Sequence, residues 1–210
     1  LRLNIMDKYV DKFVITEATY MHNGKEKKLN FDIKKYSKFK DKIIYIVVDN
    51  QPPDLFKIYD SDINKNDRRG QKLVLNGYKR DNYQREMAAD SLKNIEPDDW
   101  IIVNDIDEIP NLEAINFNKM KSKIVIFKQQ MFYYKFNLLY PNFHWYGSKA
   151  CRKKDFISPQ WLRNLKHKKY SFWRLDTLFS KKKYTNIIQI KHGGWHFPNV
   201  KSAADIERKQ

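Results

Sequence analysis

The sequence has few cysteines, which cross-link a chain, and few glycines and prolines, which interrupt helices and strands. Its 210 residues include one cysteine, six glycines and seven prolines. The lone thiol, Cys151, excludes an internal disulfide, so a buried core has to stabilise the fold, as in proteins of reducing compartments. Few glycines and prolines, with 41 % hydrophobic residues, exclude a disordered or low-complexity chain. We therefore expect a single catalytic-size domain over residues 1–210.

Long apolar runs are absent as well. No segment approaches the ~18 apolar residues of a membrane-spanning helix, and no signal peptide opens the sequence. We therefore expect the covered region to be a soluble domain without a membrane segment. Because the chain begins at Leu1, inside an amphipathic segment, we also expect trimmed residues upstream, where an anchor or a targeting segment would lie.

Acidic residues are few relative to basic ones. The chain has 41 Lys and Arg against 25 Asp and Glu, a formal net charge of +16. Such a charge attracts nucleic acid, anionic lipid headgroups or a diphosphate-bearing small molecule, and it does not choose among them. The lysines are dispersed along the chain, and we interpret the excess mainly as compositional drift.

Several segments carry secondary-structure patterns. Apolar runs rich in β-branched residues predict strands over residues 12–17, 42–50 and 100–103. Apolar side chains at helical spacing predict a helix over residues 82–95, with Asp81 as its N-cap and Gln84 reaching back to complete the cap. A strand, a crossover helix and a parallel strand form the βαβ unit of an open α/β sheet. Further strands are expected within residues 123–128 and 184–191, and residues 129–140 favour an extended conformation.

The sharpest chemical feature is the cluster Asp105-Ile106-Asp107-Glu108, which follows an apolar strand. An open α/β sheet places its ligand crevice at that point. In an extended segment Asp105 and Asp107 would converge on one ion while Ile106 turns into the core. That spacing suits Mg²⁺ or Mn²⁺, which bind few carboxylates and fill their other positions with water and phosphate oxygens. An Asp-x-Asp triplet is common by chance, so a solvated acidic loop is the alternative.

The second feature is the segment HGGWHFPN near the end of the chain. The glycines Gly193 and Gly194 allow unusual backbone angles beside two bulky residues. His196 is a candidate third metal ligand. The alternative, a core histidine with a satisfied hydrogen bond, is the commoner role of a lone histidine.

Weaker candidates lie near the expected strand ends and helix. Glu17 ends the first strand, and Lys25 and Lys27 follow it. Arg85, on the first turn of the expected helix, could help to hold a phosphate near a helix N-terminus. Solvated side chains are the alternative for each. Cys151 precedes a basic run that could lower its pKa, although no second nucleophile signature accompanies it.

In their order along the chain these segments resemble glycosyltransferase family 17, the β-1,4-mannosyl-glycoprotein N-acetylglucosaminyltransferases that add the bisecting GlcNAc of N-glycans. The motifs span nearly the whole chain. They read VDKFVITEATYMHNGKEKKLNF, KDKIIYIVVD, NYQRE, DDWIIVNDIDEIPN, YGSKACR and GGWHFPNV.

The resemblance implies an α/β fold of the GT-A type, with a mostly parallel central sheet flanked by helices. It implies Mn²⁺ (or Mg²⁺) and a UDP-sugar donor, with inversion at the anomeric carbon. Asp105 and Asp107 then correspond to the metal motif that also holds the nucleotide-sugar, and His196 resembles a C-terminal histidine directed at the same metal. The remaining positions that it places near the nucleotide pocket are Glu17, Lys27 and Arg85.

Some residues depart from the family pattern. Thr16 and Ala18 flank Glu17 where other residues are more usual, and Pro198 follows WHF where serine is usual. These departures leave the acceptor open. The sequence also shows no counterpart of the membrane anchor of the Golgi enzymes in the family, so the compartment stays open.

The leading hypothesis is inverting transfer of a sugar, GlcNAc, from a UDP donor to a hydroxyl of a glycan or another carbohydrate. The metal would offset charge on the leaving diphosphate while a carboxylate removes the acceptor proton. Glu108 is the first choice for this base, and bracing of the metal loop is an equal alternative for it. Glu17, Asp155 and Asp176 also remain open as the base.

Three other functions compete with this hypothesis. In a nucleic-acid-binding protein the lysines would contact phosphates and exposed aromatic side chains would stack on bases. Dispersed lysines and aromatic residues within apolar runs argue against this, so we expect no nucleic-acid partner. The carboxylate cluster would also suit a metal-dependent phosphoryl-transfer enzyme. The last alternative is a catalytically silent, lectin-like relative that still binds carbohydrate.

Overall fold

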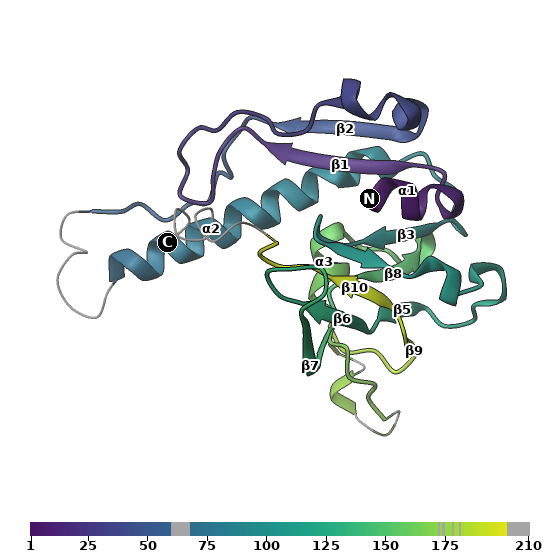
Figure 1. Ribbon diagram of the computed structural model, residues 1–210. Helices are drawn as coiled ribbons and strands as arrows, with labels where there is room; N and C mark the ends of the chain where they lie inside the picture. The colour runs from purple at the N-terminus through teal and green to yellow at the C-terminus, as the bar shows by residue number, and fades with distance from the viewer. Residues whose placement is uncertain (60–67, 172, 174, 178, 181, 201–210) are drawn as a thin grey trace. The chain divides into compact units, whose positions relative to one another are not determined.

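The computed structural model describes residues 1–59, 68–171, 173, 175–177, 179–180 and 182–200. The chain forms two compact units, one of Val10–Asn94 and one of Leu1–Tyr9 with Ile95–Gln210. Each unit combines helices with strands (Figure 1), which confirms the mixed α/β class. The single domain over residues 1–210 stays a prediction.

The unit Val10–Asn94 is built on two parallel strands. β1 (Phe13–Ala18) pairs with β2 (Ile43–Val48), and Phe13 lies opposite Ile43. Both strands lie where the apolar runs predict them. Two short 3-10 turns over Ile33–Lys42 (η2), which meet at a kink at Tyr36, lead into β2. The crossover between these parallel strands is therefore a loop with 3-10 turns.

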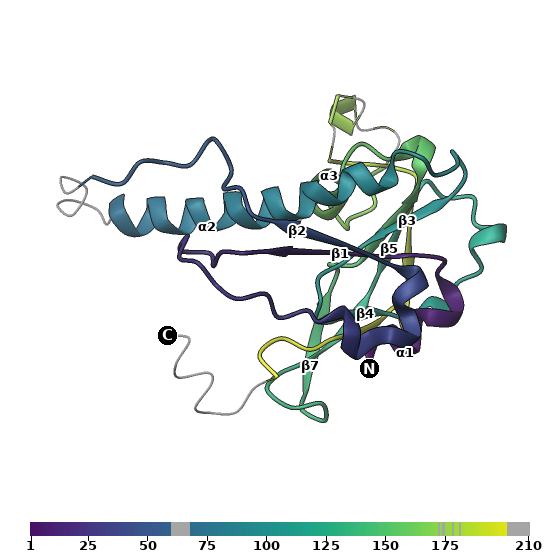
Figure 2. The same cartoon turned by 90° about the horizontal axis from the view of Figure 1, so that it is seen from above.

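Helix α2 covers Arg68–Glu86, and the 3-10 helix η4 (Met87–Leu92) continues it. It lies alongside β1 and β2 in both views (Figure 1 and Figure 2). The helix therefore begins well before residue 82, and the predicted start was wrong. Asp81 lies inside the helix and is not its N-cap. The side chain of Gln84 donates a hydrogen bond to the Thr16 carbonyl at 2.9 Å instead of completing a cap.

The sequence pattern does not predict the first half of α2, because the residues that this half buries are not apolar. Asn76 and Gly77 are the buried residues of this helix, whereas Leu73, Val74 and Leu75 are exposed. The Asn76 amide exchanges two hydrogen bonds with the backbone of Phe56, at 2.8 and 2.9 Å. An apolar stripe at helical spacing is therefore missing from this half.

The second unit, Leu1–Tyr9 with Ile95–Gln210, contains two four-stranded mixed sheets, ordered β3-β8-β5-β9 and β4-β10-β6-β7. The predicted strands near residues 100–103, 123–128 and 184–191 are confirmed as β3, β5 and β9. The strands described in this second unit are β3 (Trp100–Val103), β4 (Glu108–Pro110), β5 (Ile124–Phe127), β6 (Gln129–Phe132), β7 (Leu139–Trp145), β8 (Lys149–Arg152), β9 (Ile187–Ile190) and β10 (Gly194–His196).

The pairing of these strands corrects the expected mostly parallel sheet. β3 pairs antiparallel with β8, and β8 pairs antiparallel with β5. Parallel pairs in this unit are β5 with β9 and β10 with β6. The reason is that β8 returns directly from β7 and enters between β3 and β5 without a helical crossover. The expected βαβ unit ending in β3 is not seen among the described pairings.

The helices of this unit are short. They are α1 (Arg2–Met6), α3 (Pro159–Asn164) and the 3-10 helices η1 (Asp7–Tyr9), η5 (Leu112–Ala114), η6 (Phe117–Lys119), η7 (Lys153–Asp155) and η8 (Leu175–Thr177). Of the helices in the described part of the chain, none is long and apolar enough to cross a membrane.

The chain passes between the two sheets at five places: from β3 to β4, β4 to β5, β5 to β6, β7 to β8 and β9 to β10. Backbone hydrogen bonds connect some of these crossings. The Phe127 amide donates to the Ser148 carbonyl at 3.0 Å, and the Gly193 amide donates to the Lys128 carbonyl at 2.9 Å. Gly194 has a φ of +114°, and a Cβ there would collide with the Ile109 carbonyl. The crossings therefore bring distant segments into close contact.

The core of this unit surrounds β5, whose four residues are fully buried. Ile124 and Ile126 pack with Cys151, Leu162 and other apolar side chains. Burial raises the pKa of the Cys151 thiol to about 12. The expectation that the following basic residues lower this pKa was wrong, because the thiol points into the core and not toward them.

Candidate active site

The carboxylate motif forms a tight turn between the two sheets. The Glu108 amide donates to the Asp105 carbonyl at 3.1 Å, and Ile106 at the tip is 81 % exposed. The expected extended segment with Ile106 in the core was therefore wrong. The chain must move here from β3 in one sheet to β4 in the other, and a turn achieves this within four residues.

Glu108 is fully buried and anchors this turn. Its carboxylate accepts hydrogen bonds from Trp145 Nε1 at 2.5 Å, from Ser148 Oγ at 2.9 Å and from the Asp105 amide at 3.3 Å. It also forms a two-pronged ion pair with Arg163, with N···O distances of 2.6 and 2.9 Å. A carboxylate offers about four lone-pair positions. Both oxygens of Glu108 are therefore fully engaged.

Arg163 links α3 to the carboxylate turn. The Ser158 hydroxyl caps α3 by accepting from the Trp161 amide at 3.2 Å. From this helix Arg163 also reaches the Asp105 carboxylate at 2.5 Å. Burial alone would lower the pKa of Arg163, but its hydrogen bonds to Glu108 and the neighbouring carboxylates raise it. Arg163 is therefore a permanent cation within the acidic cluster.

Three further residues hold this arrangement. Arg2 of α1 donates to the Asp105 carbonyl at 3.0 Å and to the Asn104 side chain at 2.9 Å. The buried Lys149 ammonium donates to the carbonyls of Arg163 and Leu165, at 2.7 Å for the latter. Burial and the Arg163 charge lower the pKa of Lys149 to about 8. At Gly147 a Cβ would collide with the Glu108 carboxylate and Arg163, so a larger residue there would displace this ion pair.

Asp107 and His196 meet beside the buried Glu108. Ligand atoms of Asp107, Glu108 and His196 lie within 4.8 Å of one another. His196 ends β10 opposite Glu108, and its Nε2 lies 3.4 Å from Asp107 Oδ2. Burial alone would raise the pKa of Asp107, but the hydrogen bond and charge of His196 hold it below its usual value. The indole of Trp145 stacks on the imidazole at 4.6 Å between ring centroids.

These side chains fit a divalent cation at Asp107 and His196. Each offers a ligand atom, these atoms lie within 4.8 Å of one another, and His196 Nδ1 is buried without a hydrogen-bond partner among the described residues. Glu108 belongs to the same cluster by distance, but its oxygens are already engaged. Mixed oxygen and nitrogen ligands suit Mn²⁺ better than Mg²⁺, which prefers oxygen. Asp105 faces Arg163 and lies outside the three-residue cluster.

A comparison with protein-family models matches residues 1–156 to glycosyltransferase family 17. The chain belongs to glycosyltransferase family 17. The resemblance inferred from the motifs is thereby confirmed, and the chain belongs to a family of sugar-transferring enzymes. No curated protein and no solved structure matches the chain.

The matched span divides the candidate site of this family 17 chain. The carboxylate turn, Trp145 and Ser148 lie inside it, whereas Arg163 and His196 lie beyond it. His196 was predicted from its glycine-rich segment. Arg163, Arg2, Trp145 and Ser148 were missed, since a single arginine among 41 basic residues gives no signal. The YGSKACR motif, which contains Ser148 and follows Trp145, was the only available hint.

Glu17, Lys27 and Arg85 lie in the other unit, Val10–Asn94. Glu17 and Lys27 are brought together as an ion pair of 2.8 Å. Arg85 pairs with Asp81 at 3.1 Å, in the last turn of α2. The expectation that Arg85 lies on a first helical turn was wrong, because the helix begins at Arg68. Nucleotide binding by these residues stays a prediction.

Glu17 holds the loop that follows Lys27. Its carboxylate accepts from the backbone amides of Asn30 at 2.7 Å and Phe31 at 2.9 Å, and from the Tyr45 hydroxyl at 2.9 Å. Burial alone would raise the pKa of Glu17, but these bonds and Lys27 lower it to about 2. The ionised carboxylate is therefore a structural support of this unit.

Replacing Glu17 with glutamine is expected to lower the free energy of unfolding by about 1–3 kcal/mol at pH 7, because hydrogen bonds to a charged group are lost. A depressed folded-state pKa gives stability that is present above the ordinary pKa of 4.5 and disappears as the pH falls toward about 2. Denaturant melts between pH 7 and pH 3 measure this. The wild-type advantage over the variant should shrink on acidification, and an advantage independent of pH would contradict the assignment.

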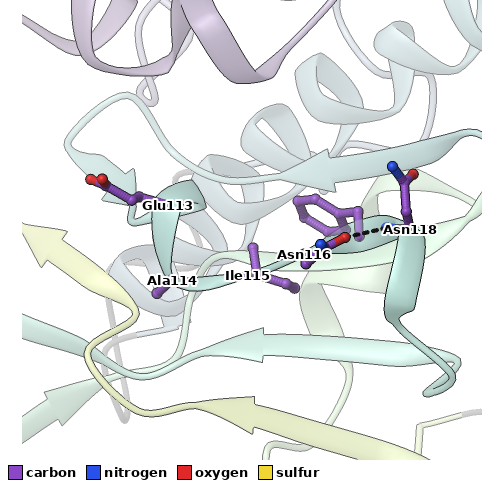
Figure 3. Close-up of a pocket in the computed structure, with 6 residues that line it drawn as sticks. Glu113, Ala114, Ile115, Asn116 and Asn118 are labelled. Atoms are coloured by element: carbon purple, nitrogen blue, oxygen red, sulfur yellow. Dashed lines mark hydrogen bonds between the residues drawn. The ribbon is translucent and has the colours of Figure 1, made fainter.

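Asp155 and Asp176, the two other alternative bases, and a surface pocket all lie outside the cluster of Asp107, Glu108 and His196. Asp155 pairs with Lys123 at 3.2 Å, and Asp176 pairs with Lys183 at 2.7 Å. A shallow pocket lined by residues 113–118 follows β4 (Figure 3), where the Asn116 side chain accepts from the Asn118 amide at 3.1 Å. It contains none of the cluster residues. This pocket therefore does not coincide with the carboxylate turn.

Proposed function

We propose that this chain is a metal-dependent inverting glycosyltransferase that moves a sugar, GlcNAc, from a UDP-sugar to a carbohydrate or glycoprotein hydroxyl. Family membership gives the class of reaction. The observation that supports the metal and the diphosphate is the Asp107–His196 pair, on a turn that the buried Glu108 braces. Donor and sugar follow from the resemblance of the motifs.

In this proposal Asp107 and His196 hold Mn²⁺ or Mg²⁺, and Asp105 lies at the edge of the site. When bound, the ion would stabilise the charge that develops on the departing diphosphate. Three carboxylates here face the guanidiniums of Arg2 and Arg163. With the Lys149 ammonium beside Glu108 these charges balance, so a divalent cation would make the loaded site positive and attractive to a diphosphate.

We assign Glu108 to bracing the turn, because five donated hydrogen bonds occupy its carboxylate. A general base must accept a proton from the acceptor hydroxyl, which requires a free lone pair. Glu108 would have to lose one of its partners to do so. Its role as the base stays a prediction that this geometry does not favour.

On the nucleotide side we propose Lys27 and Arg85, with Glu17 as the support of Lys27. Both cations are already paired, with Glu17 and Asp81 respectively. A nucleotide phosphate would therefore share them with these carboxylates. A guanidinium has donors enough for two partners at once, so Arg85 is the better suited of the two.

A transfer assay tests this function. The protein is incubated with Mn²⁺, UDP-GlcNAc and a biantennary N-glycan, and the products are identified by mass spectrometry. The proposal predicts an acceptor enlarged by one N-acetylhexosamine, and chelation by EDTA should stop the reaction. No transfer, together with cleavage of a model phosphodiester such as bis(p-nitrophenyl) phosphate, would instead support a phosphoryl-transfer enzyme.

A further inference from the structure

The hairpin of β6 and β7 exposes its apolar side chains on both faces. Every residue from Leu139 to Phe143 is exposed, although successive strand residues point to opposite sides. The strands are visible in Figure 1. The exposed apolar side chains of this hairpin have exposed fractions of 41 % to 59 %: Tyr134, Phe136, Leu138, Leu139, Tyr140 and Phe143. Exposed apolar surface of this extent usually marks a binding site.

The aromatic rings of the hairpin form two rows. In one row Tyr133 contacts Tyr134 and Tyr140, with centroid distances of 5.3 and 6.1 Å, and Tyr140 contacts Phe143 at 5.7 Å. The rings of each row support one another. They therefore form an extended aromatic surface and not a scatter of single side chains.

The second row reaches the candidate active site. Phe136 and Phe132 both contact Phe197, with centroid distances of 5.1 and 5.4 Å. Phe197 follows His196, and its amide donates to the Asp107 carbonyl at 2.9 Å. Trp145, at the end of β7, stacks on His196. This second row is therefore continuous with the residues proposed to hold the metal.

The chemistry of the hairpin suits an uncharged partner. Residues 129–145 contain seven aromatic residues and a single charged one, Lys135, whereas 31 % of the whole chain is charged. Nucleic acid or an anionic lipid surface would require clustered basic side chains. Phenol hydroxyls and the amides of Asn137 and Asn142 instead offer hydrogen bonds beside apolar ring faces. This combination matches sugar rings, which have apolar C–H faces and hydroxyl edges.

The backbone of the hairpin is also held in an unusual conformation. Tyr134 has a φ of +64° and Asn142 a φ of +62°. For a bulky residue such as tyrosine this region is disfavoured. Backbone strain of this kind concentrates at ligand sites, where it aims side chains. It presents Tyr134 at the tip of the hairpin.

We propose that the aromatic hairpin, residues 129–145, is the surface that binds the acceptor, a neutral oligosaccharide whose rings stack on Tyr140, Phe136 and their neighbours. That the bound oligosaccharide is the acceptor of a transfer reaction rests on the proposed transferase function. Continuity with Asp107 and His196 places one end of a bound glycan next to the reacting centre.

The test measures binding of mannopentaose, chitotetraose and the N-glycan core pentasaccharide by saturation-transfer NMR and calorimetry, with Mn²⁺ and UDP present. Phe136→Ala and Tyr140→Ala should each weaken binding roughly 2- to 10-fold, as expected for one aromatic stacking contact. Tyr140→Phe keeps the ring and should bind nearly as the wild type does. Trp173→Ala, an exposed aromatic residue outside the hairpin in the same unit, is the matched control and should change nothing.

The outcomes separate this proposal from the proposed function. If none of the three oligosaccharides binds, or if the alanine variants bind as tightly as the wild type, the hairpin assignment is overturned. It is equally overturned if the variants abolish only binding to phosphatidylcholine vesicles or only self-association in light scattering. Oligosaccharide binding that depends on the hairpin, in a protein that gives no Mn²⁺-dependent response to UDP, would keep the carbohydrate surface and reject the transferase function.

Discussion

Replacing Arg163 with methionine is expected to lower the free energy of unfolding by about 3–5 kcal/mol. Glu108 has no exposed surface, and Arg163 is the cation that compensates it. Removing one member of a buried ion pair leaves the other charge uncompensated, which costs about this much. Chemical denaturation followed by circular dichroism measures the change.

The double variant Glu108→Gln with Arg163→Met should recover part of this loss, since it removes both charges. Arg152→Met is the matched control, because its partner Asp98 is largely exposed. Pairs of that kind contribute about 0–1 kcal/mol. A loss below about 1 kcal/mol for Arg163→Met would show that the Glu108 pair does not hold the turn.

Replacing Asp107 with asparagine is expected to weaken Mn²⁺ binding by at least about 100-fold. Even residues that only hydrogen-bond to a metal ligand change metal affinity by about 10- to 100-fold when they are replaced, so removal of a charged ligand should have a larger effect. His196→Ala should weaken binding to a similar degree. Titration of the protein with Mn²⁺, followed by electron paramagnetic resonance, gives the affinity without any assay of transfer.

Glu113→Gln serves as the control for this change. Glu113 is an exposed carboxylate of the same unit and lies outside the cluster of Asp107, Glu108 and His196. The substitution Glu113→Gln removes the same charge from the protein as Asp107→Asn does, and it should leave the Mn²⁺ affinity unchanged. If Asp107→Asn and Glu113→Gln bind Mn²⁺ equally well, the ion is not held at the carboxylate turn.

The sequence locates the strands better than it locates their partners. β1, β2, β3, β5 and β9 are mostly apolar runs rich in β-branched residues, and this local pattern is enough to predict them. Pairing is a long-range property, so nothing local indicated that β8 inserts antiparallel between β3 and β5. The start of α2 was missed because buried Asn76 and Gly77 take the place of apolar residues.

The same division holds for the candidate site. Asp105, Asp107 and Glu108 are adjacent in the chain, so their cluster was apparent. That Glu108 is buried under Trp145, Ser148 and Arg163 depends on three segments that the fold brings together. Ile106 was placed in the core because a period of two was assumed, and the turn between the sheets removes that period.

The most direct test of the proposed function is the thermal stability of the protein with Mn²⁺ and each of UDP, GDP, CMP and ADP, repeated with EDTA. A ligand that binds only the folded state stabilises it by about 2.7 kcal/mol at one hundred times its dissociation constant. We predict that UDP raises the melting temperature when Mn²⁺ is present and that EDTA abolishes this rise. The other nucleotides should change the melting temperature little. No response to UDP, or a response that EDTA leaves intact, would contradict a metal-dependent UDP-sugar site.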